Sequence, residues 1–177
     1  SVVMVGAINA CMNVLGVLRI FFLGLNNILL PETSRAYKSK GITGLTAYLG
    51  KVSFFGGVVT LLIVLIAGVW NEYWLMLLYG NTYSGYGWIV IWWGIYFLIG
   101  FFHRPYVAGL SVVDKTKRIF QSMIVGFGLF VVLGYPAIAL WRVHGIMFLM
   151  CFSNLVALIL LGTNLTREVR YARSHTV

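Results

Sequence analysis

Five long apolar stretches alternate with short polar segments along the chain. They cover about residues 2–30, 52–70, 86–110, 119–140 and 145–165. About 20 consecutive apolar residues are enough for a helix to cross a bilayer, and Pro31 follows the first stretch at a point where proline favours a helix end. The pattern predicts an all-α fold, a polytopic transmembrane helix bundle of about five spans, with residues 1–177 forming a single domain.

Basic residues are concentrated in alternate polar segments. Ten of them lie between the first and second spans, between the third and fourth, or after the fifth, whereas only Arg142 lies in the other two segments. The ten are Arg35, Lys38, Lys40, Lys51, Lys115, Lys117, Arg118, Arg167, Arg170 and Arg173. Because cytoplasmic loops near span ends collect Lys and Arg, we expect these three segments, including a basic tail over 166–177, to be cytoplasmic.

The segment from about 32 to 50 has a pattern of its own. Ile42, Leu45 and Leu49 recur at helical spacing among basic and polar residues. This spacing predicts an amphipathic cytoplasmic elbow that lies on the inner leaflet. A solvated loop with basic residues near anionic lipid fits the same pattern.

Composition narrows the class of protein further. Hydrophobic residues make up 60% of the chain and charged residues 10%, whereas soluble domains carry about 25% charged residues. The net charge of +9 would suggest nucleic acid as a partner in a soluble protein. Here the basic residues lie in short loops between spans, so the charge indicates topology, and the expected partner is the lipid bilayer and not nucleic acid.

Patterns typical of catalytic and metal sites do not occur in the sequence. It contains no Gly-rich phosphate loop, no His-Glu-x-x-His and no paired carboxylates, and its four acidic residues fall in loops or at span ends. His103 and His144 are expected at different depths, too far apart to share a haem iron. Cys11 and Cys151 lie in apolar stretches and are expected to pack. We expect no enzyme activity, no metal and no cofactor.

Aromatic residues gather between the second and third spans. Nine Trp and Tyr residues occur within the 24 residues from Trp70 to Trp93. An interfacial aromatic belt accounts for such a cluster. Alternatively, Trp88, Trp92 and Trp93 present flat faces against which sugar rings could pack.

Two arginines, Arg19 and Arg104, fall inside predicted spans. Arg19 is about eleven residues from the cytoplasmic end of its span, roughly 16 Å, which is close to the bilayer midplane. Arg104 is about six residues, or roughly 9 Å, from the cytoplasmic end of its span, so its side chain could reach the interface by snorkelling. A charge at such depth is expensive and indicates a functional site, although Arg19 could instead pair with a carboxylate on another helix.

The order of these features resembles a known family. The motifs that carry the resemblance are the segments Pro31-Glu32-Thr33-Ser34-Arg35, Leu77-Leu78-Tyr79-Gly80-Asn81-Thr82-Tyr83, His103-Arg104-Pro105 and Asp114-Lys115-Thr116-Lys117-Arg118, and a final helix pair joined near Gly145. The chain resembles the last five helices of a polysaccharide or O-antigen flippase of the multidrug/oligosaccharidyl-lipid/polysaccharide exporter superfamily. It departs from the family at Ile146, Met147 and Phe148, where small residues are often found after the glycine.

The resemblance implies a fold and a function. The five spans would be most of the second six-helix lobe of a two-lobed transporter in the bacterial cytoplasmic membrane, with the preceding helices supplied by a longer protein. That transporter would flip or export lipid-linked oligosaccharide or polysaccharide precursors by alternating access. The alternatives are a multidrug and toxin extrusion type antiporter, which would need acidic cavity residues, and a non-transporting membrane anchor or assembly subunit.

The resemblance also implies roles for the two arginines. A guanidinium can bind the oxygens of a lipid pyrophosphate in two places at once. In this interpretation Arg19 is the main phosphate contact, and Arg104 is a secondary contact nearer the loading side.

Overall fold

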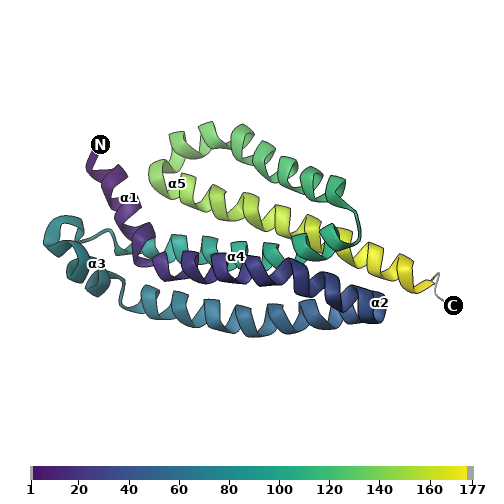
Figure 1. Cartoon of the computed structure of the whole chain (residues 1–177). Helices are drawn as coiled ribbons and strands as arrows, with labels where there is room; N and C mark the ends of the chain where they lie inside the picture. Colours follow the sequence, from purple (N-terminus) through teal and green to yellow (C-terminus); the bar gives the residue numbers. More distant parts are fainter. Residues whose placement is uncertain (1, 175–177) are drawn as a thin grey trace.

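The computed structural model describes residues 2–174, and their regular structure is entirely helical (Figure 1). The elements are α1 (Val2–Val14), α2 (Gly16–Val69), α3 (Asn71–Tyr79), the short 3-10 helix η1 (Gly80–Tyr83), α4 (Gly87–Val112) and α5 (Thr116–Ser174). Helices α2, α4 and α5 are long and apolar enough to cross a membrane. Over the described residues the chain is therefore all-α, and its three long apolar helices indicate a multi-pass membrane protein. Residues 175–177 of the predicted basic tail lie outside the described residues.

Two of the long helices fold back on themselves. The backbone is non-helical at Lys40 and Gly41 in α2 and at Arg142 in α5, and Figure 1 shows each helix as two antiparallel arms. Gly41 adopts a φ of 59°, where glycine meets no Cβ penalty. We refer to 16–39 and 42–69 as the first and second arms of α2, and to 116–141 and 143–174 as those of α5.

The arms and α4 occupy the ranges of the five predicted spans, with one difference at the start. The first predicted span, 2–30, is divided at Leu15 into α1 and the first arm of α2. Figure 1 shows α1 leaving the bundle at an angle to α2. That each of the five segments crosses the bilayer remains a prediction.

Helix α4 is central to the packing and contacts both α2 and α5. Glycines allow this close approach, because a Cβ added to Gly56 would lie 2.5 Å from the Phe101 ring, and one added to Gly109 would lie 2.7 Å from the Leu49 side chain. Large apolar side chains such as Phe55, Val132 and Leu140 are exposed on the outer arms. An exposed apolar surface of this kind suits lipid as the surrounding solvent.

The predicted elbow over 32–50 falls where the two arms of α2 meet, and its place on the inner leaflet remains a prediction. These residues form the adjoining ends of the two α2 arms. Leu45 and Leu49 are buried with Leu110 and Leu161, and Ile42 packs against the same cluster. The apolar side of the amphipathic stretch therefore covers the end of α4. Its leucines are buried against other helices of the protein, whereas the sequence pattern predicted contact with lipid.

The three basic segments lie at one end of the bundle. In Figure 1 the turn of α2, the α4–α5 connection and the last turns of α5 are together, whereas α1, α3 and the turn of α5 lie at the opposite end. At that opposite end, the Glu72 carboxylate accepts hydrogen bonds from the backbone N–H groups of Gly85 and Gly87, at 3.2 and 3.0 Å. The basic segments, which alternate with other polar segments along the sequence, are thus together at one end of the folded bundle.

Candidate functional site

The strongest candidate site surrounds Arg104 on α4. Its Nη1 donates a hydrogen bond to Oδ1 of Asn26 at 3.0 Å. The guanidinium carbon lies 4.2 Å from the centroid of the Phe22 ring, which is within the range of a cation–π contact. The side chain is therefore turned toward the first arm of α2.

Arg104 has no carboxylate partner among the described residues. The ion pairs found there join Arg35 to Glu32, and Lys115 and Arg118 to Glu168. The Nε of Arg104 is buried and has no hydrogen-bond partner within residues 2–174. A charged donor left unsatisfied at a partly buried position is costly, so this guanidinium retains the capacity to bind an anionic group.

A cavity of about 420 Å³ adjoins the Arg104 guanidinium. It lies between the first arm of α2, α4 and the first arm of α5, and its polar lining residues are Asn26, His103, Arg104 and Ser111. The remaining lining residues are Leu29, Leu30, Gly100, Val107, Ala108 and Met123. An apolar cavity with a few convergent polar groups is typical of ligand sites.

A second cavity of about 460 Å³ continues from the first between α4 and the two arms of α5. His103 and Met123 line both cavities. The other lining residues include the aromatics Tyr96, Phe127 and Phe130 and the polar residues Ser153 and Asn154. No acidic residue lines either cavity within the described part of the chain.

Arg19 is placed differently from Arg104. It is exposed on the first arm of α2, seven residues and roughly 10 Å before Asn26 on the same helix face. It does not line the cavity beside Arg104. The structure therefore brings one of the two predicted arginines into the site and leaves the other on an open surface, farther from the basic end.

The three predicted tryptophans are partly buried against the core cluster at the α3 end. Trp88 stacks on His144, with ring centroids 3.9 Å apart and the planes 8° from parallel. Trp92 meets Phe148 edge-on, and Trp93 packs against Tyr96 and Phe97. One face of Trp88 is thus occupied by His144, so that face is not available to a sugar ring.

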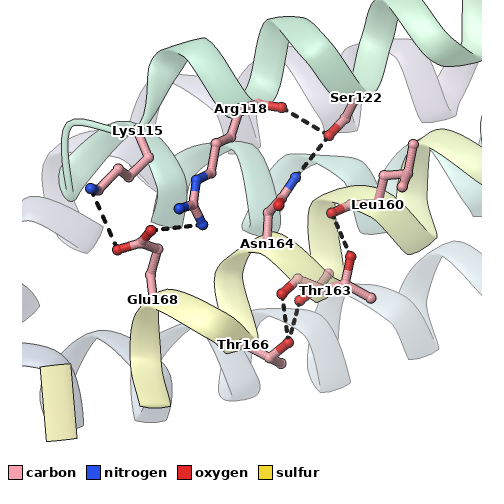
Figure 2. A network of polar contacts seen from close by, with 9 residues as sticks. Lys115, Arg118, Ser122, Leu160, Thr163, Asn164, Thr166 and Glu168 are labelled. Atoms are coloured by element: carbon pink, nitrogen blue, oxygen red, sulfur yellow. Dashed lines mark hydrogen bonds and ion pairs between the residues drawn. The ribbon is translucent and has the colours of Figure 1, made fainter. Parts of the chain in front are cut away.

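A polar network holds the basic end together (Figure 2). Glu168 on the second arm of α5 pairs with Arg118 at 2.7 Å and with Lys115 at 3.7 Å. One turn away, Asn164 Nδ2 donates to Ser122 Oγ at 3.2 Å, and this hydroxyl donates to the Arg118 carbonyl at 2.8 Å. The network ties the α4–α5 connection to the last helix, so these two basic residues have a structural role.

Sequence reasoning missed Asn26 and the cavity role of His103. Asn26-Asn27 is an amide pair inside an otherwise apolar stretch, and such polar residues within a span are a usable signal of a site. Among the described residues no group of His, Cys, Asp and Glu could hold a metal ion. Cys11 and Cys151 are buried as free thiols.

Comparison of the chain with known protein families, with curated proteins and with solved structures found no match.

Proposed function

We propose that this chain is part of a membrane transporter, not an enzyme, that flips or exports lipid-linked oligosaccharide or polysaccharide precursors across the cytoplasmic membrane. The observation that carries the proposal is Arg104, a guanidinium that has no carboxylate partner in residues 2–174 and lies beside a mostly apolar cavity. A lipid pyrophosphate is an anion attached to an apolar chain, and it matches that combination of charge and surface. The sequence resemblance to the flippase family supports the same conclusion.

The geometry favours Arg104 over Arg19 as the main phosphate contact. This reverses the roles that the sequence analysis gives to the two arginines. In this proposal Arg104 is the phosphate contact, because it lines the cavity and has no carboxylate partner among the described residues. Arg19 lies on the same face of α2, farther from the basic end, and attracts the substrate at a distance. His103 and Asn26 are further polar contacts in the cavity.

The multidrug antiporter alternative fits the site less well. An organic cation binds best to carboxylates or to aromatic faces. No described carboxylate lines either cavity, Phe and Tyr side chains line only the second one, and the Arg104 guanidinium would repel a cation from the first. The proposed transporter would rely on further helices of the same protein to complete a two-lobed cavity. Its basic end would face the cytoplasm.

Arg104→Ala is the direct test, made in the protein that carries this chain and reconstituted in vesicles with a labelled lipid-pyrophosphate oligosaccharide. We expect flipping to fall at least tenfold, since a charge-assisted contact of about 1.5 to 3 kcal/mol is lost. The flipping rate of Arg104→Lys should lie between those of the wild type and Arg104→Ala, because lysine keeps the charge but cannot form two parallel hydrogen bonds as a guanidinium does.

Lys117→Ala is the matched control, since this basic residue is exposed at the basic end and lines neither cavity. It should leave flipping unchanged. Unaltered flipping by Arg104→Ala, at equal protein abundance in the vesicles, would contradict the proposal.

A further inference from the structure

A third cavity lies on another side of α4 from the Arg104 site. It has a volume of about 400 Å³ and is formed by the second arm of α2, by Pro105 and Tyr106 of α4, and by the second arm of α5. Its polar lining residues are Thr46, Ser53, Tyr106, Thr166 and Arg170. Four hydroxyl groups and a guanidinium therefore gather at the basic end of the bundle, in a place that the proposed transport function does not use.

Within the described part of the chain, no carboxylate compensates the positive charge of this cavity. Arg170 is exposed and belongs to none of the ion pairs found in residues 2–174. No acidic residue among positions 2–174 lines the cavity, and the exposed Lys51 directly follows its lining residue Gly50. The hydroxyls of Thr46 and Thr166 donate to backbone carbonyls of their own helices. The Arg170 guanidinium, with the hydroxyls of Ser53 and Tyr106 beside it, is therefore the group that suits the oxygens of a phosphodiester.

An apolar groove of about 480 Å³ adjoins this polar cavity. Gly50 and Ser53 line both, and the groove continues along the second arm of α2 past Phe54, Gly57 and Leu61, with Leu98 and Phe102 on α4. From Gly50 to Leu61 the helix rises roughly 16 Å, which is about half of the 30 Å hydrocarbon core. The groove therefore reaches about as deep as one leaflet.

We propose that these two adjoining cavities form a binding site for one anionic phospholipid, with the phosphate beside Arg170 and an acyl chain in the groove from Gly50 to Leu61. The polar part lies at the basic end and the apolar part is deeper, so the site has the same polarity as a lipid of that leaflet. A free phosphate ion would leave the groove empty. The site is independent of the Arg104 cavity and of what the transporter carries.

The test uses phosphatidylglycerol with a photoactivatable diazirine near the end of one acyl chain. The protein that carries this chain is reconstituted in phosphatidylcholine nanodiscs containing the probe, irradiated, and mapped by mass spectrometry. We expect labelling to concentrate at residues 54–61 and 98–102. Excess phosphatidylglycerol should displace the probe, and excess phosphatidylcholine should not.

Two variants and two matched controls sharpen the test. Arg170→Ala should reduce labelling about fivefold, the effect of one basic residue near an anionic lipid. Gly50→Leu should block the junction of the two cavities, since an added Cβ meets nothing within 4 Å there and the helix tolerates it. Arg167→Ala and Gly68→Leu are the controls, because Arg167 is an exposed neighbour in the tail and Gly68 has the same open space at the other end of the arm.

Equal labelling from a phosphatidylcholine probe would overturn the proposal, as would labelling that neither Arg170→Ala nor Gly50→Leu reduces. Displacement of the probe by a polyprenyl phosphate but not by phosphatidylglycerol would also overturn it, because the occupant would then be a carrier lipid. Loss of labelling in both variants with wild-type labelling in both controls would support it. Because no transport is measured, failure here and failure of the transport proposal are distinguishable.

Discussion

Arg104 and Arg118 lie on consecutive helices of one bundle but in opposite surroundings. Arg118 pairs with the Glu168 carboxylate at 2.7 Å at the basic end. Arg104 instead donates a hydrogen bond to the neutral Asn26 amide and lies over the Phe22 ring, with no ion pair among the described residues. A paired arginine stabilises the fold locally, and an unpaired one retains its charge for a ligand. The comparison shows that charge alone does not identify a functional arginine; its partners do.

The largest expected effect concerns which side of the membrane each end occupies. Single cysteines at Asn81 and Lys117, in a background without Cys11 and Cys151, should be labelled by impermeant reagents from opposite sides of sealed vesicles. Asn81 is in η1, directly after α3, and Lys117 is in the first turn of α5, directly after the α4–α5 connection; α3 and that connection lie at opposite ends of the bundle. Asn81 should react from outside, as the positive-inside rule requires. Reaction of both positions from the same side would disprove that the two ends of the bundle lie on opposite sides of the membrane. The basic end, with Arg118, could then not be assigned to the cytoplasm.

Asn26→Asp should give Arg104 a carboxylate partner, as Arg118 has in Glu168. A carboxylate would take the place of an amide oxygen that lies 3.0 Å from Nη1, so Arg104 would gain an ionic partner and lose affinity for an anionic substrate. We expect flipping to fall about tenfold, while the melting temperature is kept or raised. Asn27→Asp is the control, since Asn27 is exposed and lines neither cavity beside His103; equal losses from both variants would show that a general charge effect is responsible.

Glu168→Gln makes the reverse change at the basic end. It leaves Arg118 and Lys115 without their carboxylate, and the pair is partly exposed, so the expected loss is about 1 kcal/mol. The melting temperature in detergent should fall by about 2 to 4 °C, with transport per folded molecule unchanged. Glu32→Gln removes a more exposed ion pair with Arg35, so it should lower the melting temperature by less. A Glu168→Gln protein that is fully stable but inactive would reverse the roles assigned to the two regions.

Arg19→Ala should have the smallest effect on transport. Arg19 is exposed and lies roughly 10 Å from Asn26 along the helix, so it acts on an approaching anion at a distance and does not bind it in the cavity. We expect about a two- to threefold reduction that weakens as salt is raised. A loss as large as that of Arg104→Ala, insensitive to salt, would restore Arg19 as the main phosphate contact.

Hydropathy and charge patterning by themselves determined the class of this protein and the ranges of its apolar helices. Both are local properties, because a bilayer requires apolar helices with internally satisfied backbones and basic residues follow the short loops between them. The reversals near Lys40 and Arg142 lie in polar segments that the sequence marks as boundaries. The basic segments consequently gather at one end of the bundle, as their alternation predicts.

Only the tertiary structure decided which polar groups meet. Asn26 and Arg104 are 78 residues apart in the chain, and Leu45 and Leu49 face Leu110 and not lipid. Hydropathy says how apolar a helix face is, but it does not say which neighbour covers that face. The partner of a side chain depends on how helices rotate and pack against one another, and that packing is set by many small contacts between distant parts of the chain.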